Sequence, residues 1–127
     1  MNFSQTSFLT VDDLIEIADA VLPAVQIRDL GAMEAAAARP QTTLRGELAF
    51  PTLPSQAAAL MHALARNHPL VDGNKRLAWS ATKVFLLING EQITYNVDDA
   101  EKVVVGVASG TYSLEQLTDW LVQATAK

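Results

Sequence analysis

Residues 54–88 read PSQAAALMHALARNHPLVDGNKRLAWSATKVFLLI, and this stretch decides the fold. It begins with Pro54, which suits a first helical position, and its apolar residues then recur at helical spacing. From Leu77 to Ile88 it is apolar nearly all round, as expected of a helix enclosed by others. Between the two parts lie Pro69 and the turn Asp72-Gly73-Asn74. The stretch therefore predicts two helices joined by a short loop, with the second helix central to the fold.

The first of these helices is expected to carry His68 at its end. Ala57, Leu60, Met61 and Leu64 form one apolar face that leads to His68. The second helix is expected to start near Gly73 or Asn74 and to stop at Asn89-Gly90.

Four further helices are expected around this pair, with residues 41–53 forming a loop or short flap. The residue before a proline avoids helical geometry, so the helix preceding Pro40 should stop short of it. The expected helices are one capped by Thr10 that ends near Pro23, one capped by Asp29, one from Asp98 or Asp99 to Gly110, and one with the capping box Ser113 and Gln116. Valines 103–105 leave a strand open as an alternative for the third of these. The prediction is an all-α, compact bundle of about six helices in a single domain, residues 1–127.

Composition excludes several classes of protein. The chain has no cysteine, so it contains neither a disulfide nor a thiolate metal site. It has no basic segment leading into an apolar run at its start and no apolar run of membrane-spanning length, which predicts a cytoplasmic protein without a membrane partner. Its net charge of −5 argues against direct binding of nucleic acid.

Positive charge is nevertheless concentrated in the middle of this acidic chain. Between Leu48 and Gly90 the one acidic residue is Asp72. The same stretch contains six basic or titratable residues: Arg66, Lys75, Arg76, Lys83, His62 and His68. This distribution favours a site for a small anionic ligand.

The nine residues from His68 to Arg76 combine the groups needed to transfer a phosphorus-containing group. A helix that starts near Gly73 directs free N–H groups and the positive end of its dipole at the turn, which attracts phosphate. Lys75 and Arg76 add full charges there, and Gly73 lets the backbone approach an anion closely. Asp72 is placed to hold Mg²⁺ bridging phosphate oxygens. His68, on the opposite side of the turn, is placed to act as a general base.

Each residue also has a purely structural interpretation. Taken alone, His68 on an apolar face is more often a hydrogen-bonded core residue. Asp72 and Asn74 alone are as readily helix caps, Gly73 a turn residue, and the two cations a solvated face. The occurrence of all these residues together, at fixed offsets, favours a functional site over separate structural roles. His62, Trp79 and Phe85 are interpreted as structural.

The nine residues resemble the Fic/Doc signature, in which His, an aromatic, Asp or Glu, Gly or Ala, Asn, Gly or Lys, and Arg follow in that order. Leu70 stands where the signature usually has Phe. Three flanking stretches are similar to the family too: Arg28-Asp29-Leu30-Gly31, Ala38-Arg39-Pro40-Gln41 and Pro51-Thr52-Leu53. The resemblance covers most of residues 8–123 and implies the helical Fic/Doc fold.

Two positions distinguish the branches of this family. Fic proteins that transfer AMP typically have Gly at the position of Lys75 and a second Arg at the position of Trp79. Asn74-Lys75-Arg76 is instead similar to the Doc branch, whose toxin phosphorylates a threonine of elongation factor Tu and halts translation. In that branch the Lys is understood to present the γ-phosphate, rather than the α-phosphate, to the acceptor. Gly73 is shared with Fic proteins, whereas the Doc prototype has Ala.

Carried over to this chain, the resemblance assigns each residue a role. His68 is the base, Asp72 organises metal and phosphate, Arg66 matches a functional arginine, and Asn74, Lys75 and Arg76 bind phosphate. The implied cofactors are ATP and Mg²⁺, and the implied substrate is a translation factor such as elongation factor Tu. AMP transfer, or a non-catalytic binding module of the same fold, are the alternatives.

Control is expected to come from a second chain. Self-inhibiting relatives carry Ser or Thr followed four residues later by Glu and then Gly or Asn. Thr43 and Glu47 have this spacing, but Leu48 follows them. We therefore expect a separate antitoxin, with a disordered segment that folds into a helix in an apolar groove near the active site.

Overall fold

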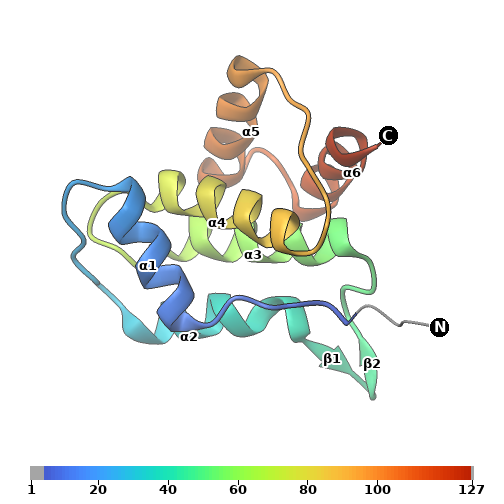
Figure 1. The fold of residues 1–127 in the computed structure, drawn as a ribbon, viewed down its shortest axis with the longest axis horizontal. Coiled ribbons are helices and arrows are strands. Elements are labelled where there is room, and N and C mark those ends of the chain that lie inside the picture. Colours follow the sequence, from blue (N-terminus) through green and yellow to red (C-terminus); the bar gives the residue numbers. More distant parts are fainter. Residues whose placement is uncertain (1–4, 127) are drawn as a thin grey trace.

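The computed structural model describes residues 5–126 and contains six α-helices, a short 3₁₀ helix and a two-stranded hairpin (Figure 1). The elements in chain order are α1 (Val11–Val21), α2 (Leu30–Ala38), η1 (Arg39–Gln41), β1 (Thr43–Leu44), β2 (Glu47–Leu48), α3 (Leu53–Asn67), α4 (Asn74–Ile88), α5 (Val97–Ser109) and α6 (Leu114–Thr125). The predicted all-α bundle, with its flap before the third helix, is confirmed. Within the described residues no helix has the length and apolar character needed to cross a membrane.

Side chains at the helix starts explain where five of the six helices begin. Thr10, Thr52 and Ser113 each form a reciprocal capping box, while Asp29 and Asn96 accept hydrogen bonds from N–H groups of the first turn. Such side chains satisfy donors that the helix cannot pair internally. The caps predicted at Thr10, Asp29 and Ser113 are confirmed.

The central helix is α3, and the prediction that the helix after the loop is central was wrong. Helix α3 packs against α2, η1, α4, α5 and α6, whereas α4 contacts α1, α3 and α5. Its alanine-rich sequence buries residues on every side, beyond the single apolar face expected, because small side chains let neighbours approach all round. Leu87 and Ile88 of α4 are instead 65% and 49% exposed. Figure 1 shows α3 and α4 side by side through the middle of the bundle.

Two helix boundaries differ from the sequence prediction. Helix α5 begins at Val97 because Asn96, rather than Asp98 or Asp99, is its cap, accepting hydrogen bonds from both of their N–H groups. The strand alternative for valines 103–105 is wrong. The chain also stays helical through Arg39, at φ −54° and ψ −45°, because α2 continues directly into η1, which contains Pro40.

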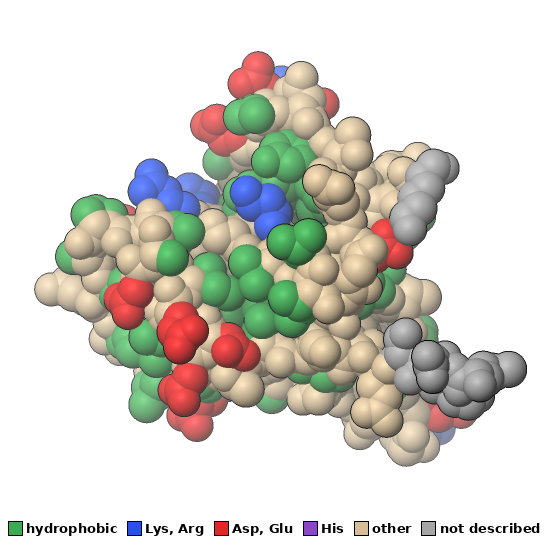
Figure 2. Space-filling model, viewed as in Figure 1, with side chains coloured by type: hydrophobic (Ala, Val, Ile, Leu, Met, Phe, Trp, Pro, Cys, Tyr) green, Lys and Arg blue, Asp and Glu red, His purple; other side chains and the backbone are tan. Residues whose placement is uncertain are grey.

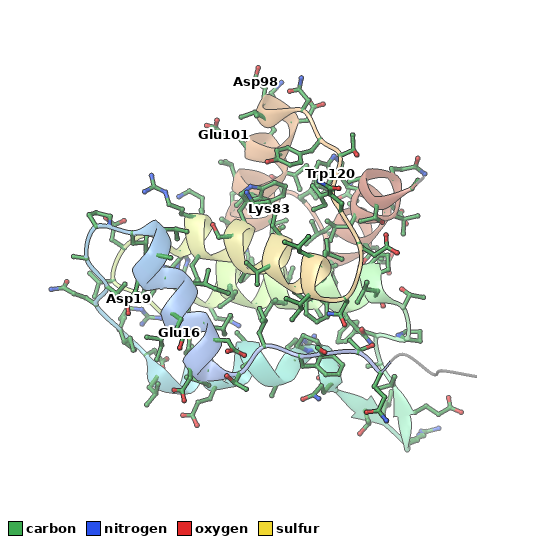
Figure 3. The ribbon with its side chains drawn as sticks, viewed as in Figure 1. Glu16, Asp19, Lys83, Asp98, Glu101 and Trp120 are labelled. Atoms are coloured by element: carbon green, nitrogen blue, oxygen red, sulfur yellow. The ribbon has the colours of Figure 1, made fainter. Side chains whose placement is uncertain are left out.

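Charge is distributed unevenly over the surface. Helix α1 carries Asp12, Asp13, Glu16 and Asp19, and Figure 2 shows acidic side chains gathered over this helix. Glu16 and Asp19 project away from the bundle (Figure 3). Lys83 lies on the α5 side of α4, with its Nζ 5.5 Å from the centre of the Trp79 ring and 6.0 Å from that of Tyr95.

Candidate active site

The loop from His68 to Gly73 leaves the end of α3 and enters the start of α4. His68 itself has left-handed backbone angles, φ 49° and ψ 62°, and Pro69 then prevents the helix from continuing. The His68 side chain is exposed, so the interpretation of His68 as a core histidine is wrong. The residue predicted to be a general base is therefore accessible to a ligand.

Asn74 ties the loop to the first turn of α4. Its Oδ1 accepts a hydrogen bond from the Leu70 N–H at 2.8 Å, and its Nδ2 donates to the Leu70 carbonyl at 2.9 Å. Leu70, in the position where the signature usually has Phe, is fully buried and anchors the loop in the core. The side chain of Asn74 thus holds the loop, a role that the sequence pattern did not predict. Its own backbone N–H remains available to a ligand.

A second segment, residues 26–29, holds the loop from the other side. The N–H groups of Arg28 and Asp29 donate to the Pro69 carbonyl at 2.8 and 3.1 Å, and that of Val71 donates to the Gln26 carbonyl at 2.9 Å. The Arg28 side chain donates to two further carbonyls, of Asn67 and His68. The spacing of apolar residues cannot reveal contacts between residues about 40 positions apart. In the sequence, the one indication that Arg28 matters was the family-like stretch Arg28-Asp29-Leu30-Gly31.

The start of α4 differs from the start of every other described α-helix. Its N-cap residue is Gly73, at φ 89°, and no side chain caps it. Within residues 5–126, no protein acceptor pairs with the N–H groups of Asn74, Lys75 or Arg76. Three N–H donors and the positive end of the helix dipole therefore face the loop, as in anion-binding sites.

These donors border a cavity of ≈ 670 Å³ that gathers most of the predicted site. Its lining residues are Leu22, Pro23, Ala24, His68, Val71, Asp72, Gly73, Asn74, Lys75 and Arg76. Lys75 and Arg76 are exposed, and Arg76 Nη1 lies 3.4 Å from the Val21 carbonyl at the end of α1. Asp72 supplies the one carboxylate of this lining. The cavity thus places a base, a carboxylate, two cations and three free N–H groups around one space.

Asp72 is suited to hold a divalent cation together with a phosphate ligand. Its Oδ1 accepts a hydrogen bond from the Gly73 N–H at 2.9 Å, which orients the exposed carboxylate. Among the described residues there is no group of three or more His, Cys, Asp or Glu side chains that would form an all-protein metal site. Mg²⁺ commonly binds through one or two carboxylates plus substrate phosphates, so a single Asp fits this ion.

Arg66 does not reach this cavity. Its Nη1 lies 3.4 Å from the Ala108 carbonyl, at the C-terminal end of α5, and the guanidinium packs over Gly110. This position suits a cation that interacts with the negative end of a helix dipole. The structure therefore places Arg66 beside the end of α5, away from the cavity that the other predicted site residues line, and its catalytic role stays a prediction.

Phe85 and Trp79 belong to the core or pack against it, as predicted, and the structural role of His62 stays a prediction. Phe85 is fully buried, and Trp79 packs against the core with its ring edge-on to Tyr95 at 4.9 Å. His62 is half-buried on α3. Burial lowers the pKa of His62, and the positive charges of Arg66 and Arg39 lower it further.

Comparisons with known proteins give a matching family model and a curated relative. A family model described as the Fic/DOC family matches residues 8–86. A curated relative, Toxin Doc of Mycolicibacterium smegmatis, is 48% identical over 95 residues, which cover 73% of this chain and 73% of that protein. The matched region of the family model includes the whole loop from His68 to Arg76.

Proposed function

This chain belongs to the Fic/Doc family, and from that premise we propose that it is the toxin of a toxin–antitoxin pair. In this proposal it is a protein kinase that transfers the γ-phosphate of ATP to a hydroxyl of a translation factor such as elongation factor Tu. The observation that carries the proposal is the uncapped start of α4, where three free N–H groups, Lys75 and Arg76 border the cavity that His68 also lines.

Phosphate binding is assigned to the backbone and the two cations. The N–H groups of Asn74, Lys75 and Arg76 point where the helix dipole is positive, so they bind anionic oxygens without reorganising. Lys75 and Arg76 add charge-assisted hydrogen bonds, which are stronger than neutral ones. The Asn74 side chain keeps the loop in place for these contacts.

Proton transfer is assigned to His68. The acceptor hydroxyl loses its proton to the neutral imidazole while its oxygen forms a bond to the γ-phosphorus. The bond from that phosphorus to the β-phosphate oxygen breaks, and ADP leaves. Mg²⁺ held by Asp72 would supply positive charge to the phosphate oxygens. The protein contributes position and charge, and no covalent intermediate forms on it.

The structure explains Gly73 without reference to the type of reaction. A Cβ at this position would lie 2.7 Å from both Cδ atoms of Leu22, and φ is 89°, a conformation that L side chains rarely adopt. The left-handed backbone at this position therefore favours glycine whatever the reaction, so its presence does not favour AMP transfer. Trp79, which stands where AMP-transferring relatives have a second arginine, carries no positive charge and packs against Tyr95 and Trp120. The absence of a positive charge at Trp79 supports the kinase over the nucleotidyltransferase, and Gly73 is neutral between the two.

We infer that inhibition requires a separate antitoxin. Thr43 and Glu47, the pair with the spacing of a self-inhibitory motif, lie on the two strands of an exposed hairpin rather than on a helix. A cavity of ≈ 370 Å³ lined by Trp79, Tyr95, Val104 and Val105 shares Lys75 and Arg76 with the phosphate cavity. An apolar helix of the antitoxin bound there would cover both cations, which fits the recognition of amphipathic helices by apolar grooves.

Labelled ATP tests the reaction and expression tests the toxin. Purified elongation factor Tu incubated with the protein should acquire label from ATP labelled at the γ position and none from ATP labelled at the α position. Expressed alone in a bacterial cell, the wild-type protein should arrest growth, and His68→Ala should not. Label acquired from the α position would show that the activity is AMP transfer and not phosphorylation. Normal growth of cells that express a protein able to bind ATP would contradict the proposal that it is a toxin.

A further inference from the structure

The backbone of His68 adopts a conformation that needs outside support. Among the described residues, His68 and Arg45 are the non-glycine residues with positive φ. Steric contact between Cβ and the backbone disfavours this region for L-residues. Strained backbone of this kind persists where the surrounding structure holds it in place.

Many left-handed helix ends are supported by their own backbone, but α3 lacks one of the donors that such ends use. In the Schellman end of a helix, the N–H of the residue after the left-handed one bonds back to a helix carbonyl. Here the residue after His68 is Pro69, which has no N–H. The last carbonyls of α3 therefore need a donor from elsewhere in the chain.

Arg28 supplies the missing donors. Its Nε donates to the His68 carbonyl at 2.7 Å, and its Nη2 donates to the Asn67 carbonyl at 2.9 Å. The planar guanidinium presents two parallel N–H groups, so it spans two successive carbonyls in a way that an ammonium group cannot. The fork fixes the peptide planes on both sides of the His68 Cα atom.

The chain around Arg28 is itself firmly placed. Its backbone N–H and that of Asp29 both donate to the Pro69 carbonyl. Asp29 is also the N-cap of α2, because its Oδ1 accepts from the Ala32 N–H at 3.0 Å. The guanidinium is thus carried by a segment anchored both to the loop and to α2.

We propose that Arg28 is a positioning residue for the transfer reaction, which sets the backbone of His68 and thereby the place of its imidazole beside the phosphate cavity. Arg28 does not line that cavity, so it acts through His68 rather than on the nucleotide. The proposal rests on the function proposed above, in which His68 is the general base.

The test compares transfer rates with ATP affinity in Arg28→Ala, Arg28→Lys and the control Thr52→Ala. Thr52→Ala removes the cap at the other end of α3, so it lowers stability without touching His68. Arg28→Ala should lower kcat by about 10- to 100-fold, the effect of a misplaced reacting group, and leave the KM for ATP within about twofold. Arg28→Lys, which keeps the charge but replaces the planar fork with a single nitrogen atom, should recover part of the rate. Thr52→Ala should keep the wild-type kcat.

A double-mutant cycle separates positioning from a general loss of structure. In a His68→Ala background, Arg28→Ala should cause no further loss of rate, because its effect passes through the imidazole. Full additivity with His68→Ala, a rise in KM in place of a fall in kcat, or an equal loss of kcat in Thr52→Ala would overturn the proposal.

A spectroscopic measurement keeps the inference separate from the proposed function. If the wild-type protein transfers no phosphate, the function is wrong, and the conformation of His68 can still be read from its backbone chemical shifts and couplings in NMR spectra. The signature of positive φ should be present in the wild type and Thr52→Ala and lost in Arg28→Ala. Its retention in Arg28→Ala would show that Arg28 does not position His68.

Discussion

The starts of α3 and α4 both have N–H groups that the helix itself cannot pair, and the two helices treat these groups in opposite ways. At α3, Thr52 accepts a hydrogen bond from the Ser55 N–H at 3.2 Å, and the Ser55 hydroxyl accepts from the Thr52 N–H at 3.0 Å. At α4, Gly73 offers no side chain, and three N–H groups face the cavity. The first helix satisfies its own donors, whereas the second keeps them for a ligand.

This difference separates stability from function along one continuous stretch of chain. A side-chain cap stabilises a helix start by about 1 kcal/mol relative to Ala and by a few tenths of a kcal/mol relative to Gly, and the start of α4 forgoes this contribution. In exchange, α4 has a preorganised set of donors beside Lys75 and Arg76. Substitutions at the start of α4 should therefore alter the reaction and leave the fold intact. Substitutions at the start of α3 should lower stability and leave the reaction unchanged.

The largest effect is expected from His68→Ala. Loss of a general base typically lowers the rate about 10²- to 10⁴-fold. The phosphate contacts at α4 do not involve the imidazole, so ATP affinity measured by calorimetry should stay close to that of the wild type. A mutant with full transfer activity would remove His68 from the mechanism.

Lys75→Ala and Arg76→Ala should each weaken ATP binding. Each deletes a charge-assisted contact of about 1.5–3 kcal/mol, which corresponds to a loss of affinity of about tenfold or more. Lys102→Ala, an exposed lysine on α5, is the matched control and should bind ATP normally. If neither Lys75→Ala nor Arg76→Ala weakened ATP binding, the phosphates would bind elsewhere. The start of α4 would then not differ from the start of α3 in function.

Thr52→Ala tests the other side of the comparison. Removal of this cap should lower the free energy of unfolding by about 1 kcal/mol, measured by urea denaturation. Phosphate transfer at a temperature where the mutant stays folded should match the wild type. A loss of phosphate transfer without unfolding in this variant would mean that the start of α3, far from the cavity, also takes part in function.

The smallest effect is expected from pH. The pKa of His62 lies below its ordinary value of 6.5 in the folded protein, so the unfolded chain binds more protons as the pH falls. The contribution of neutral His62 to stability is therefore present above pH 6.5 and is lost as the pH falls through the lowered pKa. His62→Gln should flatten this dependence in urea unfolding between about pH 8 and about pH 5, and an unchanged pH profile would contradict the assignment.

The sequence predicted the helices well because their signals are local. Thr10 with Asp13 and Ser113 with Gln116 carry their capping boxes within four residues. Where a prediction was wrong, another part of the chain decided the outcome. The central position of α3 depends on contacts with four other α-helices and η1, which the apolar spacing of residues 54–68 does not reveal.

The candidate site was predicted in its residues and less well in its geometry. The order from His68 to Arg76 identified the polar and charged groups around the cavity, but not the wall formed by residues 22–24. It did not show that the Asn74 side chain pairs with Leu70, that Arg66 lies over α5, or that Arg28 holds two carbonyls beside Pro69. Each of these depends on which donors and acceptors meet in the folded chain, and two of them join residues about 40 positions apart.

The mass of the modified target tests the central claim most directly. Elongation factor Tu incubated with the wild-type protein, ATP and Mg²⁺ should gain about 80 Da, the mass of one phosphate, and should gain nothing with His68→Ala. A gain of about 329 Da, the mass added by AMP, would contradict the claim that the start of α4 and Lys75 present the γ-phosphate to the acceptor.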